Sequence, residues 1–167
     1  MKQQDTETLQ EFSRILWGTY VWQVRLNIQY RFEKGYSPQD LDEFCLDFHE
    51  PLAVPEKVRT HRKVGSLWIN VRNSGARLER SGKTLVASSD SVPKVLDHLS
   101  KMVGKQLVSI EIRPPAGDTR FLFRDDLALN CFPAKSRDGD TWAICTVDNN
   151  QLKLGPGSRV TYESGLR

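Results

Sequence analysis

Residues 22–33, WQVRLNIQYRFE, alternate between apolar and polar side chains without interruption. Because successive side chains of a β-strand point to opposite faces, this stretch predicts one long strand with a buried face and a solvated face. A sheet must therefore lie against the apolar side of the stretch. The apolar set is Trp22, Val24, Leu26, Ile28, Tyr30 and Phe32, and the polar set is Gln23, Arg25, Asn27, Gln29, Arg31 and Glu33.

A second strong pattern, over residues 92–103, is helical. Pro93 suits a first helical turn and Gly104 a helix stop, and the apolar residues between them recur on one side of a helix. We expect this helix to pack across a sheet. Its apolar stripe is Val92, Val95, Leu96, Leu99, Met102 and Val103.

Further helices are predicted in the first third of the chain. A short helix should follow Asp5 and Thr6 and end by Gly18. For residues 38–48 we favour a short helix capped by Ser37. A strand remains the alternative there, because Phe44, Leu46 and Phe48 also alternate.

The rest of the chain has the pattern of short strands. Residues 67–87 predict a small antiparallel meander, and residues 108–131 and 142–162 predict further hairpins because their connections are short. We therefore predict a single α+β domain over residues 1–167, rich in antiparallel β-sheet, with two or three packed helices. Residues 1–56 are a candidate N-terminal subregion, and residues 64–163 form a meander-helix-meander core.

Composition limits the class of protein. The chain has 167 residues, 38% hydrophobic and 27% charged, which is typical of a soluble globular protein. No apolar run approaches the roughly 18 residues that span a bilayer, and the polar N-terminus does not resemble a signal peptide. We expect a cytoplasmic protein that does not insert into a membrane.

No residue spacing identifies a metal, a cofactor or a reaction. The chain has three cysteines, Cys45, Cys131 and Cys145, which form no CxxC pair, and its histidines do not fall at zinc spacing. We predict buried, reduced thiols, with no metal and no cofactor. Motifs typical of hydrolases and nucleotide-binding proteins do not occur. The sequence therefore favours a binding module over an enzyme, with a hydrolase of unrecognised type as an alternative.

Charge is sorted along the chain. Residues 37–56, here called the acidic segment, contain six acidic residues and no lysine or arginine. Such a surface attracts a basic partner, so we predict a protein-binding site for one. The polar side of the long strand, with Arg25 and Arg31, could contribute to it. The candidate partner-binding residues are Asp40, Asp42, Glu43, Asp47, Glu50, Arg25 and Arg31.

An alternative is nucleic-acid binding. A short basic run, residues 57–63, follows the acidic segment directly. Together with the arginines of the long strand, it could contact a phosphate backbone. The residues that this alternative requires are Arg25, Arg31, Arg59, Arg62 and Lys63.

Residues 104–162 carry a family resemblance. The stretches GKQLVSIEI, FLFRDDLALNCF and DTWAICTVDNNQLKLGPGS resemble small uncharacterised bacterial β-rich proteins, several of which look like immunity or accessory proteins encoded beside toxins or defence systems. The resemblance rests on the strand pattern, Trp142 and the terminal 155–157 Gly-Pro-Gly. It implies a bacterial, non-enzymatic protein and supplies no catalytic residues.

Overall fold

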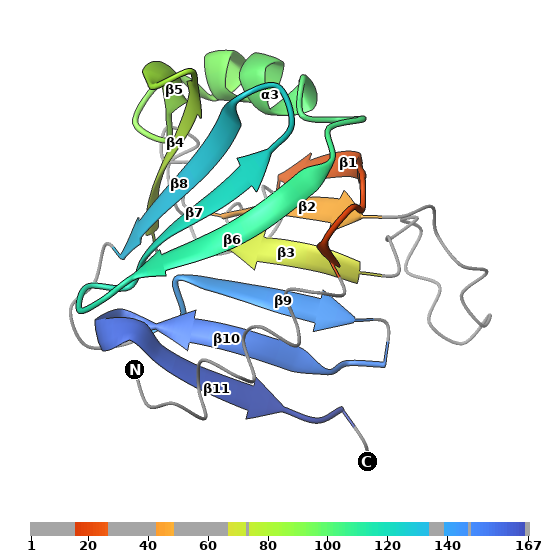
Figure 1. Ribbon diagram of the computed structural model, residues 1–167, viewed down its shortest axis with the longest axis vertical. Helices are drawn as coiled ribbons and strands as arrows, with labels where there is room; N and C mark the ends of the chain where they lie inside the picture. Colours follow the sequence, from red (N-terminus) through yellow and green to blue (C-terminus); the bar gives the residue numbers. More distant parts are fainter. Residues whose placement is uncertain are drawn as a thin grey trace.

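The computed structural model describes residues 16–26, 43–48, 67–72, 74–133, 139–146 and 148–165. These residues form two antiparallel sheets stacked face to face, and strands of one sheet run diagonally across those of the other (Figure 1). The six-stranded sheet has the order β1 (Val21–Leu26), β2 (Phe44–Phe48), β3 (Leu67–Val71), β9 (Trp142–Thr146), β10 (Gln151–Gly155) and β11 (Arg159–Glu163). The five-stranded sheet has the order β5 (Lys83–Ala87), β4 (Ser74–Arg80), β8 (Leu127–Pro133), β7 (Asp118–Phe123) and β6 (Leu107–Arg113).

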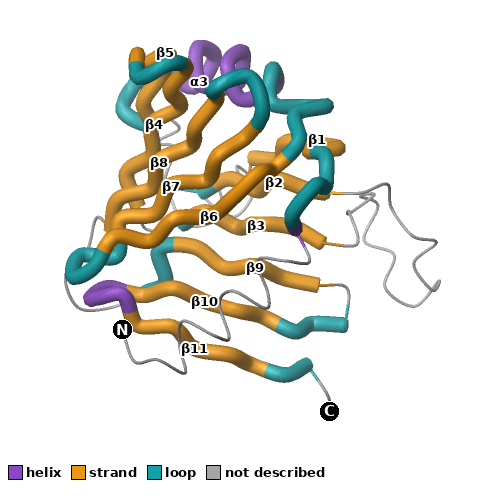
Figure 2. Tube along the Cα trace, in the orientation of Figure 1, coloured by secondary structure: helices purple, strands orange, loops and turns teal. Residues whose placement is uncertain are grey.

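The predicted α+β class is wrong. Strands dominate the described residues, and α3 (Val92–Ser100) is the one α-helix whose bounds they define (Figure 2). The prediction of two or three packed helices gave too much weight to short apolar runs, in which helix and strand periodicity cannot be separated. Residues 44–48, for which we favoured a helix, form β2 and are buried throughout. The alternation of Phe44, Leu46 and Phe48 supported the strand alternative, which is the correct one.

The N-terminal helix prediction falls mostly outside the described residues. Leu16, at its end, is helical and completely buried. Gly18 then adopts φ +79°, a conformation that favours glycine and suits the predicted stop.

The strand predicted over residues 22–33 is confirmed for its first part, since β1 covers Val21–Leu26. Its remaining residues lie outside the described ranges. The register shifts between Val21 and Gln23, so Trp22 is an extra residue in a β-bulge. Val21 therefore takes the core position predicted for Trp22 and is 1% exposed, whereas Trp22 is half-buried.

Sequence neighbours pair where their turns are tight, but two connections cross between the sheets. The predicted meander over residues 67–87 is confirmed for its second half, since β4 and β5 form an antiparallel hairpin. Its first half is wrong, because β3 pairs with β2 and β9 rather than with β4. The hairpins β6–β7, β7–β8, β9–β10 and β10–β11 are confirmed. A short turn usually joins two paired strands. The connection from β3 to β4 is equally short but leads to the opposite sheet, and the local sequence does not distinguish the two cases.

Helix α3 covers one open end of the sandwich. Val95, Leu99 and the following Met102 are buried, as the stripe predicts. Leu96 and Val103 are instead 37% and 48% exposed. The buried part of the stripe is narrower than predicted because the helix meets the end of the sandwich rather than the broad face of a sheet.

The two sheets share one hydrophobic core, in which Trp142 of β9 joins them. Its ring packs edge-on against Phe121 of β7, with 5.5 Å between centroids. Its Nε1–H donates to Oγ1 of Thr119 at 2.8 Å, and the Thr119 hydroxyl donates to the carbonyl of Gly117. The indole N–H and the threonine hydroxyl of this contact are therefore paired within the buried core.

We expect the Trp142 contact to dominate stability. Trp142→Phe should lower the free energy of unfolding by about 2 kcal/mol or more, because it removes buried volume and a hydrogen bond. Thr119→Val should cost about 1–3 kcal/mol by leaving the indole N–H unpaired. In urea denaturation the double variant should lose about 1 kcal/mol less than the sum. Trp17→Phe, at a ring 49% exposed, is the control, and strict additivity would contradict the coupling.

Candidate functional site

Two of the predicted partner-binding residues form an ion pair. Arg25 on β1 lies beside Asp47 on β2, and its fork binds both carboxylate oxygens, with 2.7 Å from Nη2 to Oδ1 and a second hydrogen bond from Nε to Oδ2. The Asp47 side chain is completely buried, whereas that of Arg25 is 21% exposed. The hydrogen bond to Asp47 raises the pKa of Arg25, so this guanidinium stays charged. The pair fixes the edge strand β1 to its neighbour.

Asp47 is therefore not part of an acidic surface. Its charge is compensated by Arg25 and removed from solvent, so it cannot steer a partner from a distance. Glu43, directly before β2, is half-buried and accepts a hydrogen bond from Asn70 Nδ2 at 3.3 Å. Asp40, Asp42, Glu50 and Arg31 lie outside the described residues. Sequence spacing could not separate the paired acid from the others, because its partner lies 22 residues away.

Of the residues that nucleic-acid binding would require, only Arg25 lies in the described ranges, and it is already paired with Asp47. The Arg25 guanidinium already donates hydrogen bonds to both carboxylate oxygens of Asp47, so these donors are not free to bind a phosphate. The other residues that this alternative needs, Arg31, Arg59, Arg62 and Lys63, lie outside the described ranges.

The predicted buried thiols are confirmed. Cys45, Cys131 and Cys145 are free and buried. Burial raises the pKa of Cys45 to about 12 and that of Cys145 to about 11. The pKa of Cys131 is raised by burial as well. The three thiols remain protonated at neutral pH, a state in which they are poor nucleophiles.

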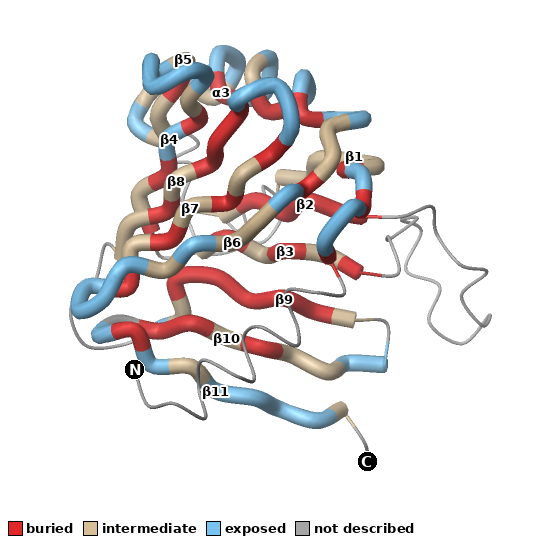
Figure 3. The backbone as a smooth tube through the Cα atoms, in the orientation of Figure 1, coloured by how far each residue is buried: buried red, intermediate tan, exposed pale blue. Residues whose placement is uncertain are grey.

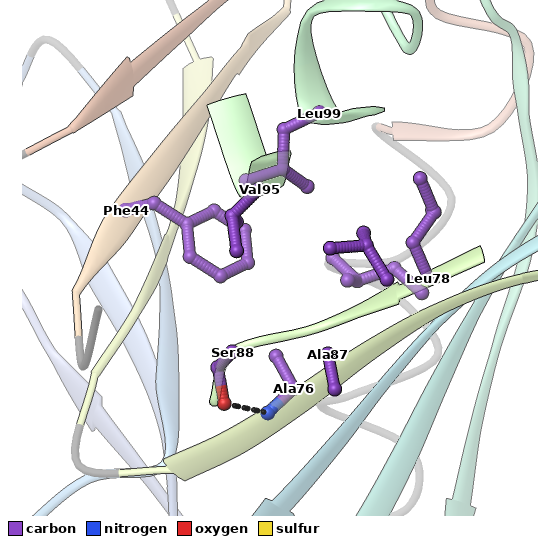
Figure 4. Close-up of a pocket in the computed structure, with 9 residues that line it drawn as sticks. Phe44, Ala76, Leu78, Ala87, Ser88, Val95 and Leu99 are labelled. Atoms are coloured by element: carbon purple, nitrogen blue, oxygen red, sulfur yellow. Dashed lines mark hydrogen bonds between the residues drawn. The ribbon is translucent and has the colours of Figure 1, made fainter. Parts of the chain in front are cut away.

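The space beneath α3 is a small apolar cavity. Phe44 of the six-stranded sheet faces Leu78 of the other sheet there, and Val95 and Leu99 close it from the helix (Figure 4). Its volume of about 10 Å³ is at the lower limit for one water molecule. This cavity is packing space of the core rather than a ligand site.

An open depression lies where the chain enters β1. It is lined by Gly18, Gln106, Leu107, Val108 and Arg124. The Gln106 amide links its walls, since it donates to the Gly18 carbonyl at 2.8 Å and accepts from Arg124 Nε. Trp17, Tyr20 and Val108 are each about half exposed around it.

A polar surface lies on the five-stranded sheet. Buried and half-buried positions alternate along β4 and β7, so one side of each strand faces the core and the other faces outward (Figure 3). We call the outward side the outer face. Its side chains include Arg77, Glu79, Glu111, Arg120, Leu122, Ala128, Asn130 and Phe132.

Three residues of the outer face stand side by side on neighbouring strands. Arg120 of β7 is directly opposite Asn130 of β8, which is in turn opposite Arg77 of β4. Arg77 Nε binds Glu79 at 3.1 Å, and its guanidinium carbon lies 4.8 Å from the Phe132 ring centre. We call Arg120, Asn130 and Arg77 the donor row.

The sequence analysis missed the donor row. The alternation along β7 does place Arg120 and Leu122 opposite to Phe121 and Phe123. Asn130 and Arg77 join Arg120 only through the pairing of three strands, of which β4 and β8 are about 50 residues apart. A hydrophobicity pattern carries no information on such register.

Among the described residues, no group of histidine, cysteine, aspartate or glutamate side chains could hold a metal ion. None of the helices in the described ranges is long and apolar enough to cross a membrane. Comparison of the chain with protein families, with curated proteins and with solved structures found no match.

Removal of the Asp47 charge should destabilise the protein strongly. Asp47→Asn leaves the Arg25 guanidinium without its counterion, and breaking a buried pair in this way costs about 3–5 kcal/mol. Glu43→Gln, a matched change on the same strand edge, should stay within about 0.5 kcal/mol. Urea denaturation of both variants checks this. Equal effects of the two substitutions would contradict a structural role specific to Asp47.

Burial of the thiols predicts a loss of stability at alkaline pH. Unfolded cysteine ionises near its ordinary pKa of 9.0, whereas folded Cys45 does so at about 12. The native state therefore holds the proton more tightly, and its stability should fall as pH rises above about 9. Denaturation midpoints between pH 8 and 11 test this, and Cys45→Ala should flatten the decline. A steeper decline in Cys45→Ala, or none in the wild type, would contradict the prediction.

Proposed function

We propose that this protein is a non-enzymatic protein-binding module whose binding surface is the outer face of the five-stranded sheet. The observation that carries the proposal is the arginine of the donor row that stacks on an aromatic ring, Arg77 over Phe132 at 4.8 Å. Arginine and aromatic side chains are enriched in protein–protein interfaces and provide many of their most important contacts.

The neighbouring side chains support a protein partner. Half-buried Leu122 of β7 is the apolar centre of the outer face, with buried Ala128 opposite it on β8 and Glu79 the next residue across on β4. Interfaces between proteins commonly have such an apolar centre with a polar rim. The face is also preorganised, because each of its strands belongs to a continuous ladder from β6 to β5. A rigid surface loses little conformational entropy on binding.

Charge balance favours a protein over a nucleic acid. Glu111 lies opposite Arg120 on β6, and Glu79 lies two residues from Arg77 along β4. A phosphate backbone would meet these carboxylates as well as the arginines, and nucleic-acid surfaces depend on an excess of positive charge. A protein partner can present both signs of charge in the matching order.

The acidic segment adds a second element to the proposal. We propose that Asp40, Asp42, Glu43 and Glu50 contact a basic region of the partner. Asp47 is excluded from this set because its carboxylate is paired with Arg25. An immunity or accessory role, as the family resemblance implies, would agree with binding of this kind.

The outer face is tested by placing a charge in its apolar centre. Leu122→Lys should reduce retention of a specific partner from a lysate of the organism that makes the protein by about tenfold or more, because a desolvated lysine would have no counterion. Leu96→Lys, at an exposed leucine of α3, is the matched control and should retain the partner. Quantitative mass spectrometry of retained proteins provides the measurement. If no protein discriminates between the two variants, the outer face is not the binding surface.

The acidic segment is tested with the partner so identified. Reversal of Asp40, Asp42 and Glu43 to lysine should slow association about 10- to 1000-fold at low salt. Reversal of Asp97, Asp126 and Asp148, which are exposed elsewhere, changes the net charge equally. Stopped-flow or biosensor kinetics separate the two sets. An acidic partner, or equal slowing by both sets, would contradict a contact at the segment.

A further inference from the structure

We propose that the donor row, Arg77, Asn130 and Arg120, binds the carboxylate of an acidic side chain in a partner protein. This inference rests on the proposed function and specifies the chemistry that its outer face recognises. The occupant is a peptide segment in which an aspartate or glutamate is flanked by apolar residues.

The geometry places the donors of three side chains next to one another, and among the described residues only Arg77 is paired, with Glu79. The three side chains project from adjacent strands in direct register, β7 to β8 to β4. Adjacent strands lie about 4.8 Å apart, so the row spans roughly 10 Å. Arginine offers only donors, and the asparagine amide offers two. A carboxylate has the complementary set, two oxygens that can accept from a guanidinium fork and from a neighbouring amide.

Two nitrogens of the row are unsatisfied in the part of the chain that the structure describes. Arg120 Nε and Asn130 Nδ2 are buried nitrogens with no hydrogen-bond partner among the described residues. Glu111 stands opposite Arg120 on β6 but forms no ion pair with it in this part of the structure. Folded proteins pair nearly all of their buried polar groups, and each unpaired one costs stability. An acceptor from outside the chain would remove this cost.

Binding requires only a local change of side chains. The two nitrogens are covered, so Arg120 and Asn130 must turn outward to meet a ligand. Because neither side chain holds a hydrogen bond, this movement breaks none. Arg77 keeps its orientation throughout, since Glu79 and the Phe132 ring hold it from two sides.

The surroundings favour a carboxylate on a protein over a polyanion. Leu122 and Phe132, both half-buried, adjoin the row and offer apolar contacts that an isolated anion cannot use. Glu79 and Glu111 would repel the successive phosphates of a nucleic acid. One acidic side chain among apolar neighbours fits both features.

The test uses the full chain and a phage-displayed library of short random peptides. Peptides are selected on the wild type, and their affinities are then measured against Arg120→Gln, Asn130→Asp and a control, Arg159→Gln. Arg159 is an exposed arginine of β11, so its variant has the same loss of charge on the other sheet. A uridine homopolymer at physiological salt is the nucleic-acid probe.

We expect the selected peptides to share an acidic residue flanked by apolar ones. Their affinity should fall about tenfold or more in Arg120→Gln and remain unchanged in Arg159→Gln. Asn130→Asp should abolish binding and raise the thermal midpoint together, because its carboxylate would occupy the row from within. A purely structural role for the row would not couple these two effects.

The remaining outcomes separate the two proposals. Peptides without acidic residues that are lost in Leu122→Lys would overturn the carboxylate site and leave the outer face as a protein-binding surface. Failure to select any peptide that depends on Leu122 or Arg120 would overturn both. Binding of the uridine homopolymer that requires Arg120 would overturn both in favour of nucleic acid, and self-association that requires Arg120 would replace the partner by a second copy.

Discussion

The contact of Trp142 with Phe121 and Thr119 is the interaction on which the sandwich depends. Two sheets stacked on apolar side chains have many arrangements of similar energy, because apolar contacts are not directional. A hydrogen bond between the sheets is directional, and its cost is high if the sheets slip and leave the indole N–H unpaired. Trp142 thus contributes a large buried ring and also fixes the position of one sheet relative to the other. Helix α3 can then cover the open end between the aligned sheets.

Once the inner faces are occupied, the chemistry of the molecule is confined to its outward surfaces. The three thiols are held protonated by burial, and the cavity under α3 has no room for a ligand. Arg25 and Asp47 of the six-stranded sheet satisfy each other. Among the described residues, Arg120 Nε and Asn130 Nδ2 of the five-stranded sheet have no hydrogen-bond partner, and neither do Asn70 Oδ1 and Thr146 Oγ1 of the six-stranded sheet. Arg120 and Asn130 differ from these because they stand directly opposite each other on neighbouring strands, as a site for one shared ligand requires.

An unsatisfied row of donors is costly to a protein of marginal stability. Replacement of Asn130 or Arg120 by apolar residues would remove unpaired buried nitrogens, so their presence needs a compensating use. Arg77 illustrates the contrast, because Glu79 pairs with its guanidinium and Phe132 lies beneath it, whereas Asn130 Nδ2 beside it has no partner among the described residues. This difference between neighbours in one row is the physical basis on which we assign recognition to the five-stranded sheet.

The sequence by itself determined the elements whose periodicity is long or whose turns are tight. Alternation from residue 22 to the described end of β1 at residue 26, the stripe through Val95 and Leu99, and the short hairpin turns each follow from local geometry. Burial and pairing with distant strands decided whether residues 44–48 form a helix or a strand. They also decided the bulge at Trp22 and the step from β3 to the other sheet. The same holds for the sites. Asp47 has the same appearance in the sequence as its acidic neighbours, and only the pairing of β1 with β2 places Arg25 over it. The donor row likewise exists only through the register of three strands, because a linear pattern specifies which side of a strand a residue occupies but not which residue lies across from it.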